Sequence, residues 1–164
     1  MPFGSSQHLP LRLAIPAMAT PTEIIRKLAP DRFANLLAAS PKNFREDLFR
    51  KAGVKTKTNN FSLSAAPKNQ VRSEKLHEAI TGGLDLGDDV LEEVIRNYLY
   101  TRRPMLAEAL DHFEVVHDNG LTDQDISFIE ALADDKRAAL RTRLESKFER
   151  DDVALYFLFM KIEG

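Results

Sequence analysis

Two pairs of residues in this sequence have the spacing of metal ligands. Glu74 and His77 are three positions apart, and so are Glu114 and His117. On an α-helix this spacing puts both side chains on one face, as in helical bundles that hold two metal ions between carboxylates and imidazoles. A metal held in this way would act as a Lewis acid or would activate a bound water molecule.

The surroundings of the first pair argue against such a site. Ligands of a bundle site point inward, but Glu74 and His77 lie away from the apolar Leu76 and Ile80 at about 100° per residue. The helix also ends at Gly82, too early for a long four-helix site. The sequence has no cysteine, which excludes thiolate ligands and disulfides. We therefore expect no metal site, no cofactor and no small-molecule ligand.

Other catalytic patterns do not match either. The glycine-containing stretch 82–87 lacks the preceding strand and the following lysine of a phosphate-binding loop. No serine sits in a nucleophile elbow. We expect a protein that is not an enzyme, and a metal-dependent activity through the two Glu-x-x-His pairs is the disfavoured alternative.

The charges are unevenly distributed along the chain. Residues 1–73 hold 12 basic and 4 acidic side chains, a net charge of +8, and residues 74–164 hold 11 and 21, a net charge of −10. The whole chain carries only −2. Such asymmetry indicates a basic arm with a partner of its own, attached to an acidic body.

The first residues favour an extended segment. Between Leu9 and Ile15 apolar residues alternate with others, a period of two that is typical of a strand or a docked peptide. A cleaved secretory signal is disfavoured because Arg12 and two prolines interrupt the apolar run, and we expect a cytoplasmic protein. Met18 stands directly before a helix start, so residues 1–17 could also precede the native start.

Helix signals begin at Thr20. Thr20 and Glu23 form a capping box around Pro21, and further starts follow at Pro30 and Pro41. Gly53 is the expected stop. These three helices are short and must pack against other elements, because alone they bury little.

The stretch from Lys55 to Arg72 interrupts the helical pattern. It contains only basic charges and one small apolar island, Phe61-Ser62-Leu63. Loops of this length are uncommon in compact domains and are usually functional segments or linkers. We read it as a tether or docking strip.

From Ser73 onward the pattern predicts about six short helices. One has Val116 on its inward side and stops at Gly120, and the next is capped around residues 122–125. The last segment, 153–162, is apolar on all sides; a strand is the alternative, but Asp151 and Asp152 favour a helix start. The predicted fold is all-α. The expected divisions are an extended arm 1–19, a basic helical cluster 20–53, a basic linker 54–73 and an acidic helical bundle 74–164.

Two kinds of binding function fit this layout. The first is a protein–protein interaction or adaptor module that binds a partner, or itself as an oligomer, through the basic N-terminal half by main-chain pairing and small apolar anchors. The alternative is a nucleic-acid-binding accessory protein that uses the basic segment 48–73 and a helix face of Arg96, Tyr100 and Arg103. No run is apolar enough to predict a membrane span. The candidate partner-binding residues are Leu11, Leu13, Lys55, Lys57, Phe61, Leu63, Lys68, Arg72, Arg96, Tyr100 and Arg103.

Overall fold

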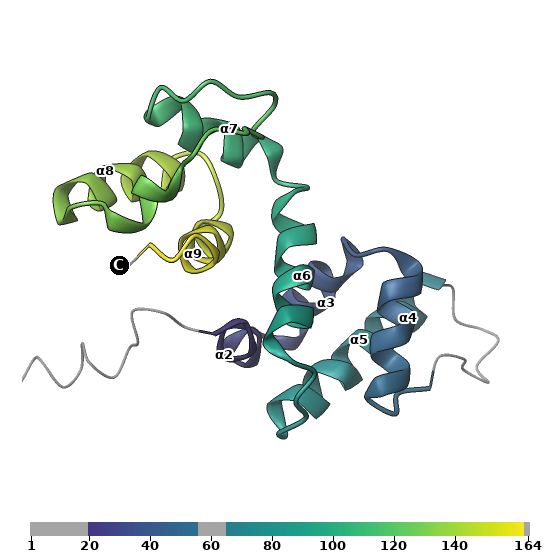
Figure 1. The fold of residues 1–164 in the computed structure, drawn as a ribbon. Coiled ribbons are helices and arrows are strands. Elements are labelled where there is room, and N and C mark those ends of the chain that lie inside the picture. The colour runs from purple at the N-terminus through teal and green to yellow at the C-terminus, as the bar shows by residue number, and fades with distance from the viewer. Residues whose placement is uncertain (1–19, 56–64, 163–164) are drawn as a thin grey trace, which may run out of the picture. The chain divides into compact units, whose positions relative to one another are not determined.

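The computed structural model describes residues 20–55 and 65–162, and only the backbone of residues 65–68 (Figure 1). Within these ranges every regular element is a helix, which confirms the predicted all-α class. The α-helices are α2 (Pro21–Lys27), α3 (Pro30–Ala38), α4 (Lys42–Lys51), α5 (Ala65–Thr81), α6 (Asp88–Leu99), α7 (Arg103–His112), α8 (Asp134–Glu145) and α9 (Arg150–Phe159), and a 3₁₀ turn, η2, spans Ser127–Ala131. The expected arm 1–19 lies outside the described residues.

The helix starts predicted at Thr20, Pro30 and Pro41 are present. The Thr20 hydroxyl accepts the Glu23 N–H at 3.1 Å, and the Glu23 carboxylate accepts the Thr20 N–H at 2.8 Å. This capping box lowers the pKa of Glu23 through the bonds from Thr20. Pro21 and Pro30 occupy the first positions of α2 and α3, where the missing N–H costs nothing.

Four helices end with a residue in the left-handed backbone region. Gly53 and Gly83 do this after α4 and α5, with φ of 73° and 117°. Glu114 and Lys161 take the same role after α7 and α9, with φ of 56° and 60°. At each end the next residue's N–H bonds back to the last turn, for example Val115 to the Leu110 oxygen at 2.9 Å. α7 therefore stops well before Gly120, where the sequence predicted its end.

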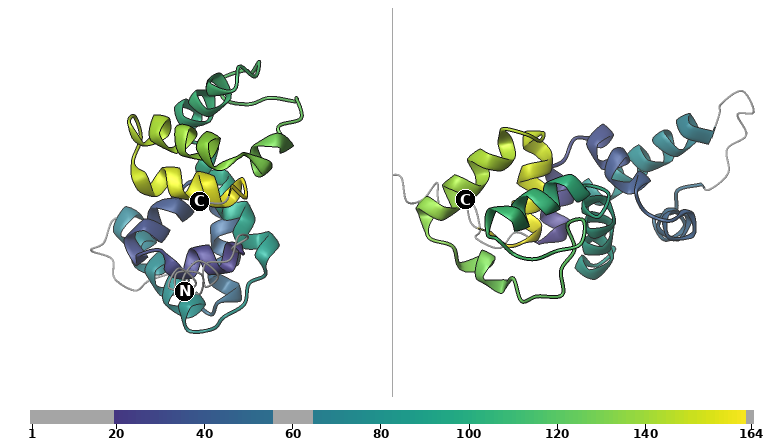
Figure 2. Two further views of the ribbon diagram at one scale, coloured as in Figure 1. Left: turned by 90° about the vertical axis from the view of Figure 1, so that its left-hand side faces the viewer. Right: turned by 90° about the horizontal axis from the view of Figure 1, so that it is seen from above.

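Residues 20–123 form one unit, called here the N-terminal unit. In it α3 packs against α5 and α6, α2 packs against the same two helices, and α4 packs against α5. Figures 1 and 2 place α4 at the edge of this group. Burial of each large apolar side chain contributes roughly 1.5–3 kcal/mol. The fully buried side chains include Ile25, Phe33, Leu36, Leu37, Leu48, Phe49, Leu76, Ile80, Leu91, Ile95 and Leu99.

This packing differs from the expected division at residue 73. The helices of residues 20–53 lie against α5 and α6, so they are not separate from the acidic part of the chain. α5 starts at Ala65, and the second half of the expected linker 54–73 is therefore helical. The physical reason is that each short helix buries little apolar surface alone and needs a larger apolar surface to pack on.

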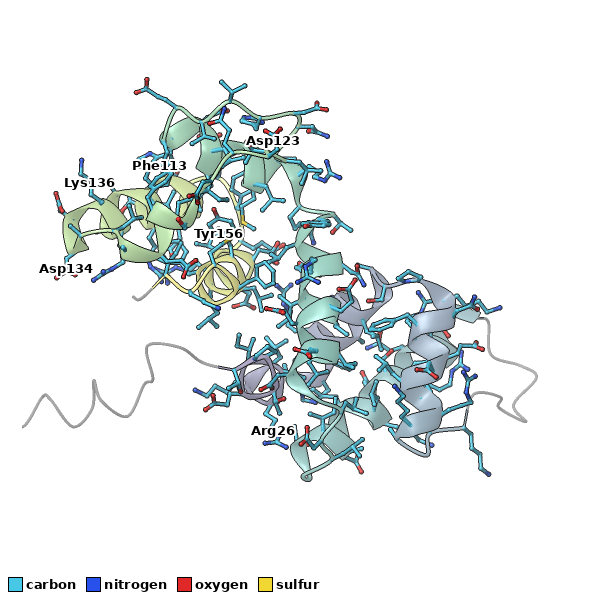
Figure 3. All side chains as sticks on the ribbon, in the orientation of Figure 1. Arg26, Phe113, Asp123, Asp134, Lys136 and Tyr156 are labelled. Carbon is cyan, nitrogen blue, oxygen red and sulfur yellow. The ribbon has the colours of Figure 1, made fainter. Side chains whose placement is uncertain are left out.

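Polar contacts also join distant parts of the N-terminal unit. The buried His77 on α5 lies 5.2 Å from the Phe33 ring, and its Nε2 is 3.0 Å from the Ile25 oxygen. Arg26 donates from Nε to the Ile80 oxygen at 2.9 Å, near the end of α5 (Figure 3). These bonds fix α2 against the C-terminal half of α5.

Residues 124–162 are the described part of a second unit, called here the C-terminal unit. α8 packs against α9, and the Arg141 guanidinium lies over the Phe157 ring at 4.3 Å. The apolar segment 153–162 is a helix up to Phe159, and the strand alternative is wrong. Burial raises the pKa of Tyr156, which is labelled on α9 in Figure 3.

The start of this unit departs from prediction. The helix expected after residues 122–125 is absent, and Asp125 instead accepts the Ser127 N–H at 2.9 Å, just before the 3₁₀ turn. This bond lowers the pKa of Asp125. An aspartate bonded two residues ahead favours a turn over a helix, because it offers the backbone another acceptor.

Candidate interaction surface

The C-terminal end of α4 is a basic surface. Arg50, Lys51 and Lys55 are all exposed. Arg50 and Lys51 each lie 3.3 Å from the single carboxylate of Asp47. Exposed pairs of this kind contribute between about 0 and 1 kcal/mol, so the cations stay available to another molecule. We call Arg50, Lys51 and Lys55 the basic end of α4.

Several of the expected binding residues lie outside the described part of the chain. These are Leu11, Leu13, Lys57, Phe61 and Leu63. Lys68 belongs to the first turns of α5, of which only the backbone is described. Their roles therefore stay predictions.

Arg72 has a place inside the N-terminal unit. It is half-buried on α5, and its guanidinium lies 5.1 Å from the centre of the Phe49 ring on α4. A cation over an aromatic face in a partly desolvated place stabilises the contact between the two helices. This position suits a structural role better than a contact with a partner.

Arg96, Tyr100 and Arg103 do not share one helix face. α6 ends at Leu99, and Arg103 is the first residue of α7. Arg96 forms ion pairs with Glu92 and Glu93 on its own helix. The sequence continues a helical pattern through Tyr100, but the turn at residues 100–102 changes the direction of the chain there.

Arg103 holds two separate backbone segments. Its Nε donates to the Tyr100 oxygen at 2.8 Å, and its Nη1 donates to the Asn119 oxygen at 3.3 Å. The guanidinium thus joins the turn before α7 to the loop after it. The planar, multi-donor guanidinium is suited to such a double contact.

His117 holds the same loop from another side. Its Nε2 lies 2.7 Å from Asp111 Oδ1, and its Nδ1 accepts the Gly120 N–H at 3.0 Å. Because Nδ1 accepts, the neutral ring carries its proton on Nε2 and donates it to Asp111. Both ring nitrogens are therefore in use, and His117 serves the loop structure in place of a metal or a substrate.

The turn at Asn119 and Gly120 is closely packed. Both residues have a left-handed backbone, with φ of 51° and 87°, and Asp118 pairs with Leu121 in an isolated bridge. A Cβ on Gly120 would lie 2.8 Å from the Arg103 oxygen and 2.9 Å from the Leu106 Cβ. Only glycine fits this approach to α7.

Apolar side chains are exposed in the segments before and after α7. Val116 is 75% exposed, Tyr100 47% and Leu121 38%. Val116 was expected to point inward on a longer helix, and that prediction is wrong because α7 ends at His112. Figure 3 labels Phe113 and Asp123, which bound the loop that carries Val116. The turn signal at residues 118–120 led the sequence analysis to end the helix at Gly120, and the loop that starts after His112 was missed.

The two Glu-x-x-His pairs do not belong to a cluster of metal-ligating side chains in the described ranges. No three histidine, aspartate or glutamate side chains of residues 20–55 and 65–162 gather as ligands. Glu74 accepts a hydrogen bond from Gln70, while His77 is bonded to a main-chain oxygen. The described helices also include none that is long and apolar enough to cross a membrane.

Comparison with known proteins returns no similarity on which an assignment could be based. No family model matches the chain, and neither the curated proteins nor the solved structures contain a significant match.

Proposed function

We propose that this protein is a non-enzymatic helical module for protein–protein interaction that binds through the basic end of α4. The partner is a protein with an acidic surface, and a second copy of the chain is one such protein. The observation that carries the proposal is the exposure of Arg50, Lys51 and Lys55 beside the single carboxylate of Asp47.

The distribution of charge in the N-terminal unit supports this proposal. Residues 20–55 contain 8 basic and 4 acidic side chains, and residues 69–123 contain 5 and 12. The named ion pairs of α4 and α6 are each made within one helix, so these pairs do not link the basic part to the acidic part. Surfaces of opposite charge steer association and set its specificity.

For self-association, the same chain carries an acidic segment that would bind the basic end of α4. The segment that starts α6 carries the exposed Asp85, Asp88 and Asp89. The basic end of α4 on one copy and this acidic segment on another would form a head-to-tail contact.

Binding to nucleic acid is the competing use of the same cations. It is less favoured because Arg96, Tyr100 and Arg103 do not form the shared helix face that was expected to contact it. Arg96 is paired with glutamates, and Arg103 donates to backbone oxygens. The acidic residues of α6 would also repel a phosphate backbone.

A charge-reversal comparison tests the proposal. One variant carries Arg50→Glu, Lys51→Glu and Lys55→Glu. The control carries Lys75→Glu, Lys136→Glu and Lys161→Glu, which are also exposed and change the net charge by the same amount. Sedimentation velocity measures self-association, and quantitative capture from the native cell extract measures binding of other proteins.

The expected result is loss of association in the α4 variant and its retention in the control. Association should also weaken with added salt, because the contact is electrostatic. Equal binding by both variants contradicts the proposal. A salt-dependent gel shift with generic duplex or single-stranded nucleic acid, lost in the α4 variant, would replace it by the nucleic-acid alternative.

A further inference from the structure

The peptide group between Asn119 and Gly120 is held at both ends. Its oxygen accepts from Arg103 Nη1 at 3.3 Å, and its N–H donates to His117 Nδ1 at 3.0 Å. Asp111 in turn holds His117 through Nε2 at 2.7 Å. Gly120 itself is buried and closely packed against the start of α7. The peptide plane of this turn is thus fixed by a hydrogen bond at each end.

An asparagine followed by glycine is the dipeptide most prone to deamidation, because glycine has no side chain to hinder ring closure. The Gly120 nitrogen attacks Asn119 Cγ, a new C–N bond forms, and the bond from Cγ to the side-chain nitrogen breaks. Ammonia leaves with the proton that Gly120 has lost. Water then opens the five-membered succinimide at either carbonyl and gives aspartate or isoaspartate.

The fixed peptide plane opposes this reaction. A left-handed backbone has ψ near about +47°, which turns the next nitrogen to the side of Cα away from Cβ. Asn119 lies in this region with φ of 51°. Ring closure requires rotation of the peptide group, and that rotation breaks the bonds to Arg103 and His117 and moves the packed Gly120.

We propose that Asn119–Gly120 is a guarded deamidation site, in which Arg103 and His117 keep the peptide group from closing on the side chain. The site reacts when the loop opens, and the isoaspartate product, with its longer backbone, does not fit the turn again. The inference does not depend on the proposed function.

The rate of deamidation at Asn119 is the quantity to measure. The full chain is incubated at neutral pH, once folded and once in urea, and aspartate and isoaspartate at position 119 are quantified by peptide mapping. We expect slow conversion in the folded protein and fast conversion in urea. Equal rates in the two states overturn the proposal.

Variants of the two guarding residues sharpen the test. His117→Leu removes the acceptor next to Gly120, and Arg103→Met removes the donor to Asn119. Each should raise the folded-state rate roughly fivefold, the effect of one lost hydrogen bond. His117→Asn, whose amide oxygen can take the place of Nδ1, should restore much of the protection. Val116→Ala, on the same loop but outside these bonds, should leave the rate unchanged.

A slower deamidation in the His117 variant would have a different cause. An imidazole that accepts the Gly120 N–H could also take its proton as a base, and then His117→Leu would slow the reaction. Slower conversion in this variant overturns the proposed guarding role. Circular dichroism confirms that each variant is folded, and all variants should share one rate in urea; should one guarding variant not fold, the other and the urea comparison still decide.

Discussion

The imidazole of His77 on α5 donates its Nε2–H to the main-chain oxygen of Ile25 on α2 over 3.0 Å. The ring is buried and tilted by 37° against Phe33. A carbonyl can only accept, so the neutral ring carries its proton on Nε2. The residue that suggested a metal ligand in the sequence thus ties two helices of the N-terminal unit together.

Loss of this bond should destabilise the protein. His77→Leu removes the donor, while the Ile25 oxygen keeps the N–H of Leu28 at 3.2 Å. Because the Ile25 oxygen still accepts one hydrogen bond, we expect a loss of about 1–2 kcal/mol in the free energy of unfolding, measured with urea. Glu78→Gln on the exposed side of α5 should change it by less than about 0.5 kcal/mol. Equal stability of both variants would show that the bond contributes nothing.

Gly120→Ala should lower the free energy of unfolding more than the same substitution at another glycine with a left-handed backbone. At Gly53 the φ of 73° is comparable, but a new Cβ meets no atom within 4 Å. Gly53→Ala therefore reports the backbone strain alone, about 1–2 kcal/mol. At Gly120 the contact with the Arg103 oxygen adds to this strain. Thermal unfolding of the two variants gives the difference, and a smaller loss for Gly120→Ala would contradict the described packing.

Glu114→Gly should stabilise the protein. Glu114 ends α7 in a left-handed conformation with φ of 56°, which glycine adopts without strain. Relief of this strain outweighs the larger entropy of glycine in the unfolded chain, and we expect a gain of about 0.5–1 kcal/mol. Glu108→Gly in the middle of the same helix is the matched control and should destabilise by about 1 kcal/mol. A loss in both variants would show that the left-handed end of α7 is not formed.

The capping box of α2 should make stability depend on pH. The bonds from Thr20 lower the pKa of Glu23 below its ordinary value of 4.5. The stabilisation is therefore complete above pH 4.5 and is lost as the pH falls below 4.5 through the lowered pKa of the folded state. Wild type and Glu23→Gln should accordingly differ in urea midpoint at neutral pH and converge in acid. A constant difference across this range would contradict the role of the carboxylate.

Tyr156 should affect the stability of the folded protein at alkaline pH. Burial raises its pKa above the ordinary value of 10.0, so the folded state binds the proton more tightly than the unfolded state does. This contribution is fully present below pH 10 and is lost as the pH rises beyond it. In Tyr156→Phe the alkaline fall in stability should be shallower, as followed by circular dichroism in a pH series. An unchanged fall would mean that Tyr156 does not cause it.

Several helix starts and ends were predictable because local chemistry decides them. The capping box at Thr20, the proline before α4 and the glycine at residue 53 act through neighbours in the sequence. The helix of the last apolar segment was equally predictable, since two aspartates at its start favour a helix over a strand.

The domain division and the loop after α7 were not predictable in the same way. Charge marked residue 73 as a boundary, but apolar packing of α3 on α5 decides the grouping, and charge patterns carry no information about it. Similarly, Val116 continues a helical period in the sequence. The helix nevertheless ends at His112, because Glu114 takes a left-handed conformation that no propensity of glutamate favours.

The wide sequence separation of the contacts of α2 has a consequence for synthesis on the ribosome. Thr22 bonds to Asp88, 66 residues later, at 2.5 Å from its hydroxyl. Translation at about 5–20 residues per second delays the emergence of α6 by roughly 3–13 s after α2. During this interval the apolar faces of α2 and α3 lack α6, one of the two helices on which they pack, so a nascent chain stalled before residue 88 should be a client of holding chaperones.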